Sequence, residues 1–137
     1  PIGVADVKRE GSDVSVITYA RQVHNALEAA EQLSTEGISV EVVDIRSLYP
    51  LDTEAILRSV RKTHRAVVLY EAVRFCGFGA EIASQIQELA FDDLDAPVLR
   101  VGAAHAPVPF SEPLEQGSFP DAERVATAIR DSLQGAR

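Results

Sequence analysis

The feature that most constrains the fold is a regular alternation between short β-branched runs and longer amphipathic segments. The runs at residues 14–19, 38–45 and 66–70 are rich in the Val, Ile, Thr and Tyr side chains that pack well on a pleated sheet. Between them, apolar residues recur at the three-and-four spacing of one helical face. Because parallel strands need a long crossover connection, usually a helix, this alternation predicts an α/β fold with a mostly parallel sheet.

The expected elements cover nearly the whole chain and leave no linker or internal repeat between them. The run at residues 66–70 is wholly apolar, which is typical of a strand covered on both faces. The Pro-rich stretch at residues 107–120 is expected to run over the surface as a loop. The helix after Gly79 is expected to bury one face, made of Ile82, Ala83, Ile86, Leu89 and Ala90. The full prediction is a single three-layer α/β/α domain over residues 1–137, with strands at 5–9, 14–19, 38–45, 66–70 and 98–101 and helices at 21–36 (closed by Gly37), at 53–62, after Gly79 and after Pro120.

Charge and composition exclude several classes of function. The 13 basic and 21 acidic residues give a net charge of −8, which argues against binding to a phosphate backbone. One Cys and three scattered His exclude a disulfide framework and a structural zinc cluster. No apolar run approaches the roughly 20 residues that a membrane span needs. The sequence therefore predicts a protein that binds neither nucleic acid nor membrane.

The chain contains no Met and begins at Pro1. We therefore expect either that the start has been removed or that these residues are a segment of a longer polypeptide. The 137 residues, 46% of them apolar, are enough to build a hydrophobic core in either case.

The turn after the third apolar run has the layout of an anion site. A strand, Gly77-Phe78-Gly79 and a helix start can together cradle a phosphate with backbone amides. A dinucleotide fingerprint needs a third Gly where Ile82 stands, and Glu81 would repel an anion at the helix start. The alternative is that the glycines allow a tight turn and close packing. Cys76 beside the turn is expected to be an inert, at least partly buried thiol rather than an activated thiolate.

Glu71 stands directly after the wholly apolar run. Ligands bind at the carboxyl ends of strands in α/β sheets, which makes Glu71 a candidate ligand-binding carboxylate, and the alternative is a hydrogen-bonded structural carboxylate. The chain has no nucleophile elbow, no zinc-protease His pair and no Walker loop. We therefore assign no catalytic, cofactor-binding or metal-binding residue, and keep Glu71 with Gly77, Phe78 and Gly79 as a candidate ligand or interface turn.

Several strings, in the right order and with matching gaps, resemble one family. Over about residues 4–133 the chain is similar to the C-terminal domain of the β subunit of the thiamine-diphosphate-dependent 2-oxo acid dehydrogenases. This is the transketolase C-terminal-like domain of their decarboxylating first component. The strings are found at residues 44–52 (DIRSLYPLD), 62–65 (KTHR), 71–72 (EA), 77–81 (GFGAE), 94–101 (LDAPVLRV), 107–110 (PVPF) and 114–115 (LE).

The resemblance implies a five-stranded mixed sheet whose short first strand runs antiparallel to the others. It also implies that thiamine diphosphate and its magnesium lie between the α subunit and the N-terminal, pyrimidine-binding half of the β subunit, which these residues do not include. The domain itself is then expected to be non-catalytic. It would pack the α subunit and a second β subunit into an α2β2 assembly and dock the peripheral subunit-binding domain of the acyltransferase.

Asp92, Asp93 and Asp95 are the candidate docking residues. Opposite charge would steer a basic docking module onto this acidic stretch and fix its register. The alternative is that these residues are solvated charges at a helix end.

The string at residues 76–81 looks closer to the branched-chain (2-oxoisovalerate) members, which predicts decarboxylation of a branched-chain 2-oxo acid and acyl transfer to lipoamide. Ala20 and His64 stand where the family commonly has Gly, and residues 103–106 replace a more polar loop. The alternatives are the same domain from a pyruvate or acetoin dehydrogenase or another transketolase-family enzyme, and a regulatory domain that binds a nucleotide or small anion. The expected compartment is the bacterial cytoplasm, or the mitochondrial matrix in a eukaryote.

Overall fold

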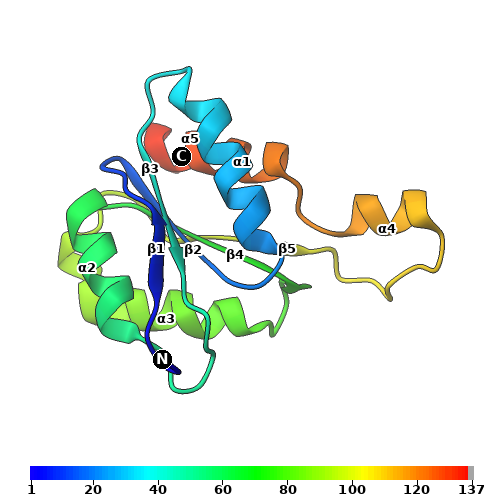
Figure 1. The fold of residues 1–137 in the computed structure, drawn as a ribbon, viewed down its shortest axis with the longest axis horizontal. Helices are drawn as coiled ribbons and strands as arrows, with labels where there is room; N and C mark the ends of the chain where they lie inside the picture. The colour runs from blue at the N-terminus through cyan, green and yellow to red at the C-terminus, as the bar shows by residue number, and fades with distance from the viewer. Residues whose placement is uncertain (136–137) are drawn as a thin grey trace.

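Five strands form one mixed sheet at the centre of the molecule, in the order β1-β3-β2-β4-β5 (Figure 1). The structure is a computed structural model, and it describes residues 1–135. Strands β2 to β5 run parallel, while β1 pairs antiparallel with β3 at one edge, which confirms the predicted sheet. The strands are β1 (Asp6–Arg9), β2 (Val14–Thr18), β3 (Val40–Asp44), β4 (Ala66–Val73) and β5 (Leu99–Ala103). The helices are α1 (Gln22–Ser34), α2 (Thr53–Thr63), α3 (Phe78–Ala90), the short 3-10 helix η1 (Phe91–Asp93), α4 (Glu112–Ser118) and α5 (Ala122–Gln134).

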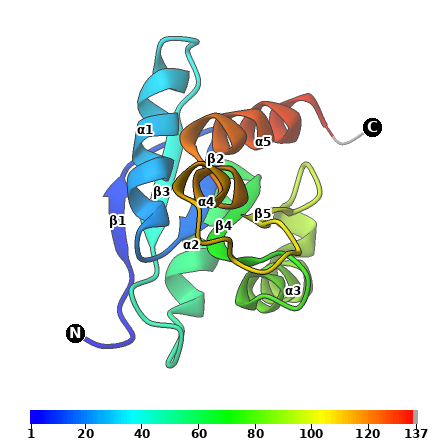
Figure 2. The same cartoon turned by 90° about the vertical axis from the view of Figure 1, so that its right-hand side faces the viewer.

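Helices cover both faces of the sheet, which makes the three predicted layers (Figure 2). α1 and α5 pack on one face, and α2 and α3 pack on the other. Successive residues of β4 alternate between these two cores, since Val67 and Leu69 belong to the first and Val68 and Tyr70 to the second. All four side chains are fully buried. The wholly apolar run therefore reflects burial on both faces, as predicted.

The predicted cap of α1 is confirmed, although its regular turns end at Ser34, two residues earlier than expected. The Gly37 N–H donates to the Ser34 carbonyl and the Ile38 N–H donates to the Leu33 carbonyl, both at 3.1 Å, and Gly37 has φ +79°, which is the pattern of a glycine C-cap. One other predicted boundary and one predicted face need correction. β4 continues beyond the apolar run to Val73, because Val73 still pairs with Ala103 of β5. Leu89 was expected in the buried face of α3, but it is 52% exposed, since the buried residues Ile82, Ile86 and Ala90 recur every four positions and Leu89 lies outside that row.

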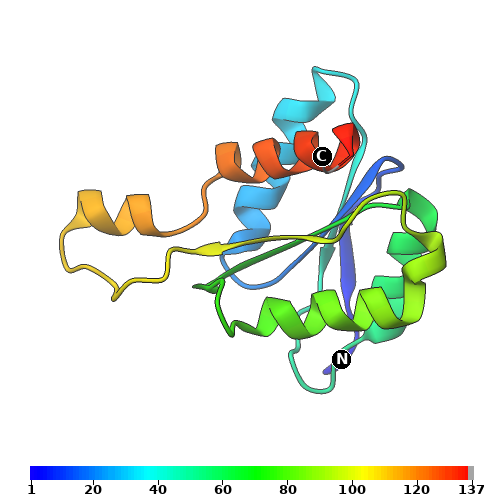
Figure 3. The ribbon, with the colours of Figure 1, turned by 180° about the vertical axis from the view of Figure 1, so that it is seen from behind.

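The Pro-rich stretch is not wholly a loop, because residues Glu112–Ser118 form α4. Pro113 stands in the first turn of that helix, where its missing N–H leaves no helical hydrogen bond unmade. Figure 3 shows α4 at the end of an extended arm that leaves the body after β5 and returns at α5. This arm is the part of the molecule that departs most from a closed three-layer shape.

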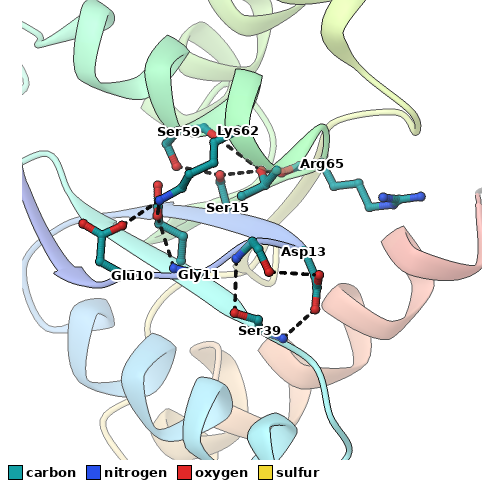
Figure 4. Close-up of polar contacts among 11 residues, drawn as sticks. Glu10, Gly11, Asp13, Ser15, Ser39, Ser59, Lys62 and Arg65 are labelled. Atoms are coloured by element: carbon teal, nitrogen blue, oxygen red, sulfur yellow. Dashed lines mark hydrogen bonds and ion pairs between the residues drawn. The ribbon is translucent and has the colours of Figure 1, made fainter.

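A polar network at the amino ends of the strands holds α2 against the sheet (Figure 4). The Ser15 hydroxyl lies 2.6 Å from that of Ser59 and 2.7 Å from that of Thr63, and all three side chains are buried. The Glu41 carboxylate, on a residue only 2% exposed, pairs with Lys62 of α2. These contacts close the amino edge of the sheet and leave its carboxyl edge as the open one.

Candidate functional site

A hollow of about 700 Å³ lies at the carboxyl edge of the sheet, between the start of α1, β4 and α4. Glu71 of β4 lines it from the sheet side, as the rule for α/β sheets predicts. Glu112, Glu115 and Asp121 line it from the arm, and Arg21 supplies the one basic side chain among the lining residues. Four carboxylates around one guanidinium make this hollow suited to cations and unsuited to a diphosphate.

Glu71 is exposed, and its carboxylate makes no hydrogen bond with any of residues 1–135. The alternative of a hydrogen-bonded structural carboxylate is therefore not what the structure contains. Burial raises the pKa of the nearby Tyr19 phenol, and Tyr70 and the Glu71 carboxylate raise it further. The Glu71 side chain thus shares its surroundings with two phenols and faces the hollow.

The Gly77-Phe78-Gly79 turn is shaped by close packing on the ring of Tyr70, which is fully buried. A Cβ on Gly79 would meet three ring carbons of Tyr70, the farthest of them, Cζ, at 2.5 Å. A Cβ on Gly77 would lie 2.7 Å from Cε2 of the same ring and closer still to the Val73 carbonyl oxygen. Packing therefore requires both glycines. This agrees with the prediction that they allow a tight turn and close packing. Glu81 lies in the first turn of α3, where its charge complements the helix dipole.

Cys76 is exposed, so the expectation of a partly buried thiol is wrong. Its backbone lies in the left-handed region, with φ +55°, inside the turn that joins β4 to α3 at the surface. Beside it, the exposed Phe75 ring stacks on His105 with centroids 5.3 Å apart and planes 21° from parallel. The two residues are 30 positions apart in the sequence, and no local sequence pattern predicts their contact.

Two of the candidate docking residues, Asp93 and Asp95, face arginines of the same molecule. Asp93 lies 3.3 Å from the Arg61 guanidinium, and Asp95 lies 3.6 Å from that of Arg65. Such exposed pairs contribute little stability, about 0–1 kcal/mol each, but they reduce the charge offered to a partner. Asp92 makes no ion pair within residues 1–135, and it is exposed. The acidic stretch is therefore present on the surface, with Asp92 as its least compensated charge.

His64 connects this acidic stretch to α2. Its ring Nδ1 donates to the Asp93 carbonyl at 2.7 Å, and its own carbonyl accepts from the Asp95 N–H at 2.8 Å. His64 caps α2 with φ +61°, and Ala20 has φ +53°. These are the two positions at which the resemblance leads us to expect Gly. The left-handed backbone explains that preference, since Gly adopts it without steric cost.

The arm, predicted as a surface loop, holds several exposed apolar side chains. Val108 is 61% exposed, Leu114 is 64% exposed, and Phe110 is fully exposed. A second hollow, of about 280 Å³, lies at the root of the arm and is lined mainly by apolar residues, among them Val73, Val108 and Phe119. Exposed apolar patches of this kind on a protein surface mark interaction sites.

Neither a metal centre nor a membrane span is found within residues 1–135. No group of three or more His, Cys, Asp or Glu side chains in this range is placed to hold a metal ion. None of the helices in the same range has the length and apolar character to cross a bilayer.

Sequence comparison places residues 3–125 in one domain family, that of the transketolase C-terminal domain. The chain is 50% identical over 133 residues to the pyruvate dehydrogenase E1 component subunit beta of Bacillus subtilis, covering 97% of this chain and 41% of that protein. It is 45% identical over 133 residues to the acetoin:2,6-dichlorophenolindophenol oxidoreductase subunit beta of the same organism, covering 97% of this chain and 39% of that protein. The mitochondrial pyruvate dehydrogenase E1 component subunit beta of Caenorhabditis elegans is 46% identical over 134 residues, covering 97% of this chain and 38% of that protein. The chain thus spans about two fifths of the length of these relatives.

Solved structures give the same fold. A split-gene transketolase, described as an inactive β4 tetramer, matches with a TM-score of 0.85 and 32% identity over 100% of this chain and 43% of that one. The 2-oxoglutarate:ferredoxin oxidoreductase of Magnetococcus marinus matches over 96% of this chain and 20% of that one with a TM-score of 0.65 and 17% identity, which is a likeness of fold alone. The chain belongs to the transketolase C-terminal domain family.

Proposed function

We propose that this chain is the C-terminal, assembly-forming domain of the β subunit of a thiamine-diphosphate-dependent 2-oxo acid dehydrogenase. Its support is the identity of 45–50% to β subunits of pyruvate and acetoin enzymes along 97% of the chain. The observation that carries the assembly role is the arm, whose apolar side chains Val108, Phe110 and Leu114 face solvent. An exposed apolar segment on a projecting arm is suited to a contact between subunits.

The residues present do not fit thiamine diphosphate. The 700 Å³ hollow at the carboxyl edge is lined by Glu71, Glu112, Glu115 and Asp121, which would repel a diphosphate. The glycine turn packs on Tyr70, and Glu81 occupies the α3 start. We therefore derive no catalytic step from this domain, and expect the cofactor and its magnesium to be held by other parts of the parent enzyme.

The proposed parent reaction is decarboxylation of a 2-oxo acid followed by acyl transfer to a lipoyl group. The prediction of a branched-chain substrate depends only on the string at residues 76–81. The relatives named above are pyruvate and acetoin enzymes, so they favour those substrate classes instead. The bacterial cytoplasm or the mitochondrial matrix stays the predicted compartment.

Substrate class is tested by reconstituting the full-length β subunit with its α subunit. Thiamine-diphosphate-dependent CO₂ release is then compared for pyruvate and 2-oxoisovalerate, and cleavage of acetoin, which has no carboxyl group to lose, is measured by the acetaldehyde it releases. Preference for pyruvate or acetoin would set the branched-chain prediction aside, and preference for 2-oxoisovalerate would restore it. Absence of release with every 2-oxo acid, from a correctly assembled complex, would contradict the proposed parent reaction.

Docking is proposed to use the acidic stretch, with Asp92 as its main contributor. Binding of a basic subunit-binding domain should weaken as salt rises from 50 to 200 mM, because exposed charges are screened. Asp92→Asn should weaken binding more than Asp93→Asn, since Arg61 already compensates Asp93. Glu28→Gln, an exposed acid on α1, is the matched control. Equal loss from the Asp92 and control variants would show that only net charge matters.

A further inference from the structure

The arm segment, residues 104–118, exposes three large apolar side chains close together, which is unusual for a surface that contacts only water. Figures 1 and 3 show it projecting from the body between β5 and α5. Val108 and Leu114 are more than half exposed, and Phe110 touches little else. These side chains lie on a short stretch of one segment, so a single partner surface can cover them together.

The charge of the arm restricts what that partner surface can be. From residue 101 to residue 123 the chain has no Lys or Arg. The arm segment itself carries two acidic residues, Glu112 and Glu115. A complementary surface must therefore offer apolar area together with positive charge.

One groove of this same chain has that character. The arginine groove, about 340 Å³ in volume, lies between the edge strand β5 and α5. Val101, Gly102 and Ala128 are among its lining residues. Its charged lining residues are Arg74, Arg100 and Arg124, with Glu123 and Asp131.

The arginines of this groove are not paired with described carboxylates, and two of them are held by backbone carbonyls. Arg100 donates to the Arg74 carbonyl at 3.0 Å, and Arg124 donates to the Gly102 carbonyl at 3.2 Å. None of the three guanidiniums lies within ion-pair distance of a carboxylate among residues 1–135, whereas Arg61, Lys62 and Arg130 elsewhere in the chain all do. In a chain of net charge −8, this groove therefore gathers three guanidiniums that no carboxylate among residues 1–135 pairs with.

We infer that the arm segment of one copy seats on the arginine groove of a second copy. The apolar arm residues would cover Ala128, which is half-buried, and the aliphatic stems of the arginines, and the Glu112 and Glu115 carboxylates would meet the guanidiniums. Both complementary surfaces belong to one chain, and the groove begins at the root of the arm, at Gly102 and Arg124. Two copies can therefore exchange arms about a twofold axis, which closes the contact into a dimer. The inference rests on the proposed assembly function and specifies the contact between β subunits within it.

The test uses the full-length protein that contains these residues and measures self-association by sedimentation velocity over a range of concentrations. Phe110→Ala should raise the dimer dissociation constant by about 10-fold or more, as truncation of a central aromatic contact does. Phe91→Ala removes an equally large exposed ring from η1, outside the arm and the groove, and should leave the constant unchanged. Equal effects of the two variants, or none from Phe110→Ala, would overturn the inference.

Charge reversal tests the exchange of arms directly. Glu112→Arg and Arg124→Glu should each abolish the dimer, because each places like charges on both contacts. Mixing these two variants should restore it, since each mixed contact again joins opposite charges. Failure of the mixture to dimerise would overturn the inference, as would dimers that persist in either single variant.

The α subunit provides the readout that separates this inference from the proposed function. The charge-reversal variants can keep their contacts between β subunits and also keep α-subunit binding and decarboxylation. In that case only the arm exchange is wrong. If Phe110→Ala instead weakens α-subunit binding alone, the occupant of the arm is the α subunit and the inference also fails. Failure of the full-length protein without substitutions to bind an α subunit would contradict the proposed function.

Discussion

Replacing Gly79 by alanine should destabilise the domain, although alanine is the better helix former. Gly79 is the second residue of α3, and its missing side chain leaves room for the Tyr70 ring. An added Cβ would lie 2.5 Å from the Tyr70 Cζ and closer to two other ring carbons. Ordinary carbon contacts begin at about 3.5 Å, so the ring or the helix must move by about 1 Å or more.

The expected loss follows from how little freedom Tyr70 has to move. Its ring is fully buried among the residues that α2 and α3 pack on the sheet, and Gly77 and Gly102 also contact it closely. Overpacking a core costs about 1–3 kcal/mol, and expelling a buried aromatic ring costs about 3–5 kcal/mol. Up to about 1 kcal/mol is recovered from helix propensity. The free energy of unfolding should therefore fall by about 2–3 kcal/mol.

Urea unfolding monitored by circular dichroism measures this loss as a lower midpoint with an unchanged slope. Gly117→Ala is the matched control, because Gly117 lies in α4 with nothing within 4 Å of its added Cβ. That variant should lose no stability. Combining Gly79→Ala with Tyr70→Val should give less loss than the sum of the two changes, since the smaller side chain relieves the clash. A Gly79→Ala protein as stable as the parent would refute the packing explanation of the turn.

Further predictions concern other positions that the structure singles out. The Asp52 carboxylate accepts from the Ala5 N–H and, as the cap of α2, from the Ala55 N–H. These hydrogen bonds hold the pKa of that carboxyl below its ordinary value. Asp52→Ala should therefore cost about 1–2 kcal/mol at pH 7. The stabilisation is present above the ordinary pKa of 3.8 and is lost as pH falls through the lowered folded value, so the urea midpoints of the two proteins should converge as the pH falls below that ordinary value; a constant gap would contradict this. Lys62→Met should cost about 2 kcal/mol in the same assay because it leaves the Glu41 carboxylate buried without its cation, whereas Lys8→Met, which breaks an exposed pair, should change little. Ala20→Gly should raise the free energy of unfolding by about 0.5–1 kcal/mol, since Gly adopts φ +53° without strain, and a loss would count against that explanation.

The layers and the order of elements could be predicted because they depend on patterns inside short windows. Residues 66–70 are apolar throughout, and the structure buries them on both faces. The antiparallel direction of β1 had no such signal, since its four residues show no strong alternation, and it followed only from the family resemblance.

The candidate site was harder to predict because its parts come from distant segments. Glu71 was found from the rule for strand ends, but the carboxylates of the arm that share its hollow lie more than 40 residues away. Pro113 and its neighbours suggested a loop, although a proline in the first turn is compatible with a helix. The pairing of Asp93 with Arg61 likewise depends on how η1 packs beside the end of α2, which the sequence alone does not reveal.

The central claim is that this domain builds the assembly of a 2-oxo acid dehydrogenase β subunit. It is tested most directly by the mass of the full-length protein co-expressed with the α subunit, measured by light scattering during size-exclusion chromatography. We expect an α2β2 complex. It should separate into smaller species with Phe110→Ala and stay intact with Phe91→Ala. A full-length protein that never binds an α subunit, or a complex indifferent to Phe110, would contradict it.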